Sequence, residues 1–306
     1  MNDMRSLRVS VPDQSWVEAL ADLRDVETVI WDMRSPQPDG YLDYVLRPLG
    51  VGATSIRLLD TGRVGAVQGQ GLGFDDIVGV LPPGGVFCNA VGVHEGPTAE
   101  IAMALMLASQ RSIDVFARQQ TTSDWITGVT RSMIGQRVLL LGYGGVNTEV
   151  EKRLSGFECE IVRVASRRRE DAQGVIHGSD ELLALLPSAD IVVVAVPYSA
   201  ATDRLLDDSF FAALADDTLV VNVARGKVAD TDAVVRQSGR VRYATDVTDP
   251  EPLPADHPLW SVPGVLISPH VGGMVATLRP RVERLVRSQI ARLQAGEELA
   301  HIAHRA

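Results

Sequence analysis

Short apolar runs alternate along the chain with segments in which apolar residues recur at helical spacing. Such runs, bounded by Gly, Pro and polar residues, predict buried strands. The first series of expected strands is Leu7–Val11, Thr28–Trp31, Ser55–Leu59, Val64–Gln68 and Val86–Asn89. The second series is Arg137–Leu141, Glu160–Val164, Ile191–Val196, Thr218–Val221, Arg242–Thr245 and Val265–Ile267. Strands that alternate with helices predict an α/β fold with parallel sheets.

The longest helical pattern runs from Pro97 to about Gln119, with apolar residues at 101, 104, 105 and 108. A second, charged helix is expected within residues 274–303. The later strands are spaced like a nucleotide-binding βαβ array, which we place at residues 93–272.

Residues 1–92 and 273–306 would then form a second, substrate-binding domain, to which the final helix returns. The predicted fold class is α/β, with two Rossmann-like domains, parallel sheets and an active-site cleft between the domains.

The chain of 306 residues is acidic, with a formal net charge of −10 and a pI of about 5.1. An acidic chain is not drawn to phosphate backbones or anionic lipid, so we expect neither nucleic acid nor membrane as a partner. Cys88 and Cys159 lie in apolar surroundings and are expected to be reduced. The first residues, MNDMRSLRVS, lack the apolar segment of a secretory signal, so we expect a cytoplasmic protein. No CxxC pair or Cys/His cluster suggests a metal site.

The stretch QRVLLLGYGGVNTEVEKRL combines a strand, a glycine turn and a helix. Gly142 and Gly144 match the first two glycines of GxGxxG, which permit the tight turn and the approach of a pyrophosphate to the helix N-terminus. Together with Gly145 and Val146 they are the candidate pyrophosphate-binding residues. Asn147 stands where the third glycine normally allows close helix–strand packing, so we expect a slightly displaced helix.

The next strand ends in VRVASRRRED, where a NAD-binding site would place an acid near Ala165. A serine hydroxyl and guanidinium groups suit a ribose 2′-phosphate instead. Ser166, Arg167 and Arg168 therefore predict a preference for NADP(H), with NAD(H) still possible. The alternative is a solvated charge run balanced by neighbouring acids.

Four segments in the second half carry a family resemblance: NVARGKVADTDAV, DVTDPEPLP, HPLW and SPHVGG. In the first half, GLGFDDI at 71–77 and NAVGVHEGPTAEIAMALMLASQR resemble a substrate loop, a hinge and a long helix. In this order and spacing they resemble the D-isomer-specific 2-hydroxyacid dehydrogenases over about residues 64–285. Gln68–Gln70 and Thr248 depart from the residues common in that family.

The resemblance assigns three catalytic residues, and the chemistry explains their types. Arg225 would clamp the substrate carboxylate and polarise the keto oxygen. His270 would donate the proton in reduction and accept it in oxidation. Glu251 would orient the imidazole and favour its protonated form. Each also has a plainer interpretation: Arg225 as a buried ion-pair partner, His270 as a strand-end histidine bonded to backbone, and Glu251 as a turn acid.

Further positions follow from the resemblance alone. Asp246 matches an acceptor for the nicotinamide carboxamide, and Thr98 matches a threonine near the cofactor phosphates. The backbone amides of the loop Gln70, Gly71, Leu72 and Gly73 match a nest for the substrate carboxylate. Of the other histidines, His94 can line the cleft, and the rest are expected to be structural or exposed.

These patterns predict an enzyme that reduces a small 2-keto acid of the glyoxylate or hydroxypyruvate type to a D-2-hydroxy acid with NADPH. The family further implies a homodimer that packs through the helix at 97–119. Alternatives are NAD-dependent oxidation of 3-phosphoglycerate, a phosphite-type oxidoreductase, and a non-enzymatic dinucleotide sensor or corepressor on the same fold.

Overall fold

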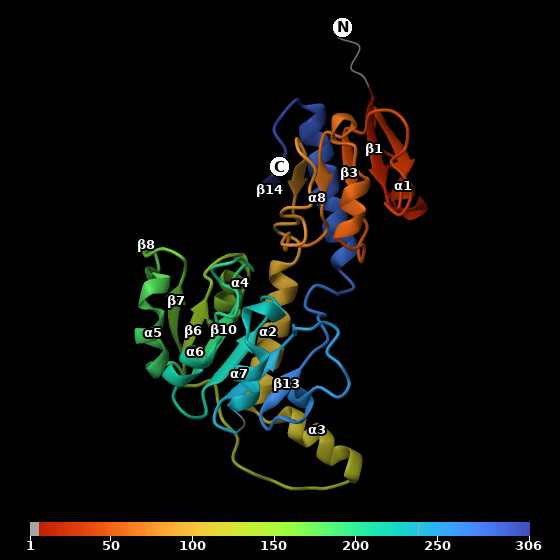
Figure 1. Ribbon diagram of the computed structural model, residues 1–306. Helices are drawn as coiled ribbons and strands as arrows, with labels where there is room; N and C mark the ends of the chain where they lie inside the picture. The colour runs from red at the N-terminus through yellow and green to blue at the C-terminus, as the bar shows by residue number, and fades with distance from the viewer. Residues whose placement is uncertain (1–5, 238) are drawn as a thin grey trace. The chain divides into compact units, whose positions relative to one another are not determined.

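The computed structural model describes residues 6–237 and 239–306, and the chain divides into two compact units (Figure 1). Unit 1 comprises Met1–His94 and Ala276–Ala306, and unit 2 comprises Glu95–Val275. Unit 2 is thus inserted into the sequence of unit 1. Each unit has its own sheet, and the predicted α/β class with two sheets that are mainly parallel is confirmed.

Unit 1 contains a six-stranded sheet in the order β14-β5-β4-β3-β1-β2. All pairings are parallel except that of β14 with β5. The strands are β1 Leu7–Val11, β2 Val26–Ile30, β3 Tyr44–Leu46, β4 Val67–Gln68, β5 Val86–Cys88 and β14 Ile302–Arg305. The helices are α1 Gln14–Leu20 and α8 Leu278–Gln294, with 3-10 turns η1 Ala53–Leu58 and η2 Thr61–Arg63.

Unit 2 contains an eight-stranded sheet in the order β13-β12-β11-β10-β6-β7-β9-β8, parallel except for the β8–β9 hairpin. The strands are β6 Arg137–Leu141, β7 Glu160–Val164, β8 Arg169–Asp171, β9 Gly174–His177, β10 Ile191–Val194, β11 Leu219–Asn222, β12 Arg242–Thr245 and β13 Val265–Ile267. The helices are α2 Glu95–Gln110, α3 Ile113–Thr122, α4 Gly145–Leu154, α5 Leu182–Leu185, α6 Asp208–Ala213 and α7 Thr231–Arg236. The 3-10 turns are η3 Ser179–Glu181, η4 Leu186–Ser188, η5 Gly226–Val228 and η6 Pro258–Ser261.

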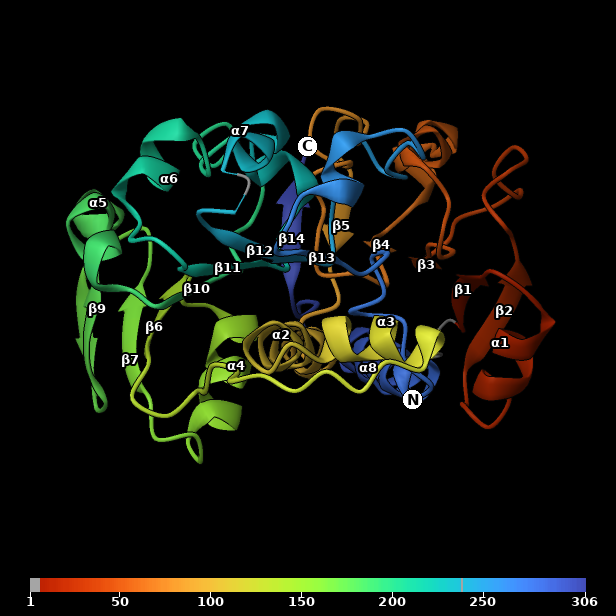
Figure 2. The ribbon, with the colours of Figure 1, turned by 90° about the horizontal axis from the view of Figure 1, so that it is seen from below.

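The central strands of unit 2 are buried on both faces, which explains their continuous apolar runs. β10, with the sequence IVVV, is fully buried along its length. Helices α2 and α4 cover one face of the sheet, and α5, α6 and α7 cover the other (Figure 2). Such an open parallel sheet leaves the loops at its carboxyl edge free to carry functional groups.

Two predicted elements are wrong. Ser55–Leu59 is not a strand, since residues 53–58 form the 3-10 turn η1. The single helix expected at 97–119 is two helices, because Ser112 adopts a left-handed φ of 52° between α2 and α3. No residue of α3 is buried, so packing does not hold it in line with α2.

Strands β3, β8, β9 and β14 are not predicted by the apolar pattern. They are only three or four residues long, and β8 is exposed throughout. Periodicity cannot identify strands of this length, even where, as in β3, every residue is buried.

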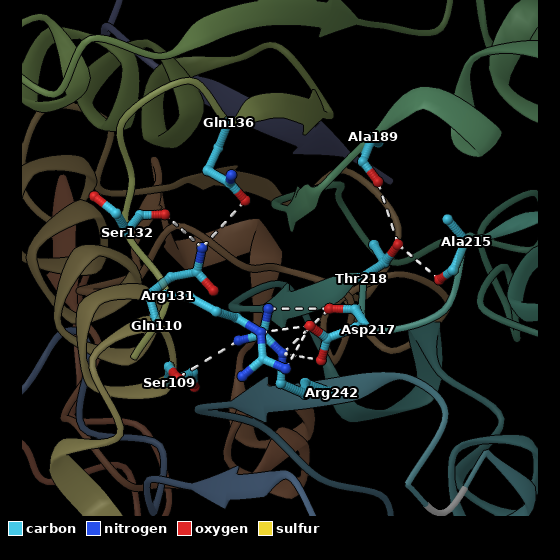
Figure 3. A network of polar contacts seen from close by, with 10 residues as sticks. All are labelled: Ser109, Gln110, Arg131, Ser132, Gln136, Ala189, Ala215, Asp217, Thr218 and Arg242. Atoms are coloured by element: carbon cyan, nitrogen blue, oxygen red, sulfur yellow. Dashed lines mark hydrogen bonds and ion pairs between the residues drawn. The ribbon is translucent and has the colours of Figure 1, made fainter. Parts of the chain in front are cut away.

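The segment 123–136 that follows α3 is tied to the sheet of unit 2 by an ion-pair network (Figure 3). Asp217 pairs with Arg131 from this segment and accepts from Arg242 Nε of β12 at 3.1 Å. Gln110 at the end of α2 also donates to the Ser132 carbonyl at 3.0 Å. Burial and the nearby charge of Arg131 lower the pKa of Arg242. Within the described ranges, no helix is both long and apolar enough to cross a membrane.

Candidate active site

The glycine turn after β6 has the geometry that its residue types predict. Gly142 has a φ of +89°, and a Cβ there would lie 2.7 Å from the carbonyl oxygen of Ala195. Gly144 caps α4 without a side-chain hydrogen bond, and a Cβ on it would meet no atom within 4 Å. The turn is therefore open at Gly144, although a Cβ on Gly145, the first residue of α4, would lie 2.7 Å from Glu95 Cγ. A helix N-terminus behind such a turn suits an anionic group.

Asn147 occupies the position of the missing third glycine and is fully buried. Its Nδ2 donates to the carbonyl oxygens of Leu141 at 3.0 Å, Gly142 at 3.2 Å and Val193 at 3.3 Å. The larger side chain is thus accommodated by hydrogen bonds that join α4 to the ends of β6 and β10.

The basic run after β7 is exposed, and its members differ in their partners. Arg168 Nη1 donates to both carboxylate oxygens of Glu181, at 2.9 and 2.8 Å. The Ser166 carbonyl accepts from the Ser179 hydroxyl at 3.4 Å. Arg167 has no polar partner among residues 6–237 and 239–306. The sequence alone gave no indication that Glu181 would lie beside this run.

Arg225 follows β11 on a loop that Asn222 holds in place. The Asn222 side chain is fully buried, accepts from the Ala224 amide at 3.0 Å and donates to the Arg225 carbonyl at 3.3 Å. Arg225 Nη1 donates to the Ala224 carbonyl at 2.8 Å, and its side chain is partly buried. Asn222 therefore fixes the backbone from which the guanidinium extends.

The loops after β11 and β12 approach each other at Gly226. A Cβ at this position would lie 1.9 Å from the Thr248 carbonyl oxygen, so only glycine fits. Thr248 differs from the residue common in the family, but the close approach to Gly226 involves only the Thr248 backbone and does not depend on its side chain.

Glu251 and His270 are brought together at the carboxyl edge of the sheet. His270 Nδ1 lies 2.5 Å from Glu251 Oε1, and the two side chains are 45% and 44% exposed. An ionised carboxylate can only accept, so Nδ1 carries the hydrogen and Nε2 is left to exchange a proton with a substrate. His270 has a φ of 53°, in the left-handed region.

Asp246, at the end of β12, holds the loop that carries His270. Its Oδ1 accepts from the Ser268 hydroxyl at 2.8 Å and the Val271 amide at 2.9 Å, and its Oδ2 accepts from the Gly272 amide at 2.7 Å. The carboxylate is only 3% exposed. Three such hydrogen bonds fix the loop on both sides of His270. The motif match did not reveal this positioning contact.

Thr98 lies within α2, three residues after its first residue, Glu95, and is partly buried. A Cβ built on Gly272 would be 3.7 Å from the Thr98 Cα, so the His270 loop passes close to this turn of α2.

The loop Gln70–Gly73 in unit 1 is held by its carbonyls and by one side chain. Gln70 Nε2 donates to the Arg47 carbonyl at 2.8 Å, and the Gln70 carbonyl contacts His94 Nε2. The Gly71 carbonyl accepts from the Ala90 amide at 2.9 Å, and the Leu72 carbonyl accepts from the Asn89 side chain at 2.8 Å.

Among the described residues, the amides of Gly71, Leu72 and Gly73 have no acceptor. The carbonyls of Gln70, Gly71 and Leu72 are hydrogen-bonded while these amides are not, and such a loop suits a carboxylate ligand. No group of three or more His, Cys, Asp or Glu side chains in the described parts of the chain could hold a metal ion.

Residues 103–272 match the model of the D-isomer specific 2-hydroxyacid dehydrogenase NAD binding domain. A glyoxylate reductase of Thermofilum pendens is 30% identical over 241 residues, which cover 74% of this chain and 70% of the relative. A D-3-phosphoglycerate dehydrogenase of Archaeoglobus fulgidus is 31% identical over 74% of this chain and 44% of its own length.

Among solved structures, the NADPH-dependent glyoxylate/hydroxypyruvate reductase of Sinorhizobium meliloti, in complex with NADP and sulfate, has the same fold. The TM-score is 0.82 at 20% identity, over 97% of this chain and 98% of that protein.

Proposed function

Because the chain belongs to the D-isomer-specific 2-hydroxyacid dehydrogenase family, we propose that it reduces a small 2-keto acid of the glyoxylate or hydroxypyruvate type with NADPH. The family makes it an NAD(P)-dependent enzyme that interconverts 2-keto and 2-hydroxy acids. The proposal adds the cofactor preference, the substrate size and the roles of individual residues.

The observation that carries the proposal is the contact between His270 and Glu251 at the carboxyl edge of unit 2. Reduction needs a hydride at the keto carbon and a proton at its oxygen. A bound nicotinamide would supply the hydride. His270 Nε2 would supply the proton, while Glu251 orients the ring and stabilises its charge. Arg225 would bind the substrate carboxylate and polarise the keto oxygen.

The dinucleotide is proposed to bind unit 2 at the turn between β6 and α4. The glycine turn and the start of α4, at Gly142, Gly144, Gly145 and Val146, would receive the pyrophosphate. Ser166, Arg167 and Arg168 would bind the ribose 2′-phosphate, which is the basis for proposing NADPH rather than NADH. Thr98 and Asp246 are proposed to lie near the cofactor phosphates and the carboxamide.

The loop Gln70–Gly73 would hold the substrate carboxylate through its amides, which makes unit 1 the proposed substrate domain and unit 2 the proposed dinucleotide domain. Arg63, one of the basic residues available for a phosphorylated substrate, is paired with Asp60 at 2.8 Å. Arg57, the other such residue, is exposed and has no side-chain partner in the described part of the chain. We propose an unphosphorylated acid because one available arginine is not the basic cluster that a phosphate would need, although a relative is named as a phosphoglycerate dehydrogenase.

We further propose a homodimer that packs through α2 and α3. Ile113, Val115 and Phe116 on α3 are 55%, 39% and 36% exposed, which is unusual for adjacent apolar side chains in a helix.

The test is absorbance at 340 nm with NADPH or NADH against glyoxylate, hydroxypyruvate, pyruvate and phenylpyruvate. Oxidation of 3-phosphoglycerate is assayed separately with NADP+ or NAD+ as the hydride acceptor. We expect turnover of glyoxylate or hydroxypyruvate with a preference for NADPH. His270→Ala should lower kcat by roughly 10²–10⁴-fold, since it removes the proton donor. Arg225→Ala should lower kcat/KM by roughly 10²–10³-fold.

Preference for NADH would contradict the assignment of Ser166–Arg168. Tight cofactor binding without turnover of any acid would favour a dinucleotide sensor.

A further inference from the structure

A carboxylate 13 residues beyond Arg168 contacts the basic run proposed to bind the 2′-phosphate. The β8–β9 hairpin returns the chain so that Glu181, in η3, reaches Arg168. Arg168 Nη1 donates to both oxygens of Glu181, at 2.9 and 2.8 Å, and the two side chains are 54% and 31% exposed. One of the two arginines proposed for phosphate binding is therefore already paired with an anion.

Glu181 is held in place by two further donors. The Gly178 amide donates to Oε1 at 3.0 Å, and His177 Nδ1 lies 2.8 Å from Oε2. The Gly178 amide first, then His177 and Arg168, lower the pKa of Glu181 to about 2. The carboxylate is thus ionised at any pH at which the enzyme would work. Its negative charge is a fixed property of the site.

This charge opposes a phosphate and suits a hydroxyl. A 2′-phosphate would have to compete with Glu181 for Arg168 and would be repelled by it. A carboxylate beside the adenosine ribose is also the group with which dinucleotide sites bind the 2′-hydroxyl of NAD. Arg167, which has no polar partner in the described part of the chain, would remain available to the phosphate.

We propose that Glu181 is a specificity-determining residue for the cofactor, which weakens binding of the 2′-phosphorylated dinucleotide and so keeps NAD usable. This inference rests on the proposed assignment of Ser166, Arg167 and Arg168 to the 2′-phosphate. It goes beyond that assignment, because a residue outside the basic run sets how strong the preference is.

The experiment measures dissociation constants of 2′,5′-ADP and 5′-AMP by calorimetry for the full-length protein. Glu181→Gln removes the charge but keeps an oxygen that can accept from the Gly178 amide. We expect 2′,5′-ADP to bind roughly fivefold more tightly, as loss of an exposed charge contact allows, with no gain for 5′-AMP. The readout is the dissociation constant of 5′-AMP divided by that of 2′,5′-ADP, which should rise in Glu181→Gln. A loss of stability alone would not raise this ratio.

Glu170→Gln is the matched control, because Glu170 is an exposed acid on β8 without a polar partner among the described residues. It should change the ratio less than twofold, since its charge is not held at Arg168. If the ratio rose equally in Glu181→Gln and Glu170→Gln, the cause would be a general charge effect, and the inference would be overturned.

Arg167→Ala and Arg168→Ala separate this inference from the cofactor assignment. If the arginine variants weaken binding of 2′,5′-ADP while Glu181→Gln leaves the ratio unchanged or lowers it, the inference about Glu181 fails. The assignment of the basic run to the 2′-phosphate then stands. If neither arginine variant affects the ratio, the assignment fails, and the inference fails with it.

Discussion

Single side chains carry the proposed chemistry, and the orientation of the His270 ring depends on a direct contact with Glu251. Glu251 contacts His270 at 2.5 Å, although both side chains are nearly half exposed. Because water can reach both groups, their alignment depends on this hydrogen bond and on the left-handed backbone at His270. Removing the charge on Glu251 is therefore a direct test of the positioning role.

Glu251→Gln should lower kcat roughly 10²-fold, because a glutamine oxygen can still accept from Nδ1 but cannot stabilise the imidazolium. Binding of NADPH should change little. Steady-state kinetics with the best keto acid, together with NADPH fluorescence titration, would separate the two. An unchanged kcat would show that Glu251 is only a turn residue.

Cys88 allows a prediction about pH. The thiol is fully buried, and burial raises its pKa to about 11. The reactive thiolate forms only as pH rises toward that value, so Cys88 should resist iodoacetamide at pH 7.5 in the native protein. It should react fully after denaturation in urea. Mass spectrometry of peptides would check this, and rapid native modification would contradict the burial.

The loops at the carboxyl ends of β11, β12 and β13 are positioned by two buried polar side chains. Asn222 fixes the Arg225 loop, and Asp246 fixes the His270 loop. The Asp246 amide also donates to the Asn222 carbonyl at 3.1 Å, so the two loops share a support.

Asp246→Asn should disrupt this support, because an amide group would present N–H to donors that now bond a carboxylate oxygen. We expect a loss of roughly 1–3 kcal/mol in the free energy of unfolding and a lower kcat. Urea denaturation and steady-state rates would measure both effects. Unchanged stability would mean that the loop is held by other contacts.

At this scale the sequence predicts some features well and others not at all. Strands such as β6 and β12 have the predicted bounds, because runs buried on both faces stand out in the pattern. The motifs identified Arg225, Glu251 and His270 as candidates. The sequence could not show that Asn222 and Asp246 hold the Arg225 and His270 loops, since these contacts depend on strand register. No residue of α3 after Ser112 is buried, and in the β8–β9 hairpin Ile176 alone is buried, so neither element leaves a clear apolar signal.

At the scale of the molecule, the exposed apolar side chains of α3 and segment 123–136 are the basis on which the proposed homodimer can be tested. Trp125 is 94% exposed and Phe116 is 36% exposed, while Asp217 anchors the segment through Arg131. Segment 123–136 is held by an ion pair and exposes apolar side chains to solvent. Such a surface fits the proposed dimer interface.

Phe116→Asp combined with Trp125→Asp should convert a dimer to a monomer, because it would bury two charges at the interface. Leu183→Asp is the control, since Leu183 is 56% exposed on α5, away from α3. Light scattering coupled to size exclusion would report the mass. A dimer that survives the double change would place the interface elsewhere.

The insertion of unit 2 into unit 1 has a consequence for biosynthesis. β5 leaves the ribosome with the first 94 residues, but its antiparallel partner β14 follows only after all of unit 2 has been made. Until then β5 has an unpaired edge, which is a site for mispairing between nascent chains. Unit 2, which is continuous in sequence, can fold while unit 1 waits for its last strand. Slow translation beyond residue 276 should therefore favour aggregation through β5.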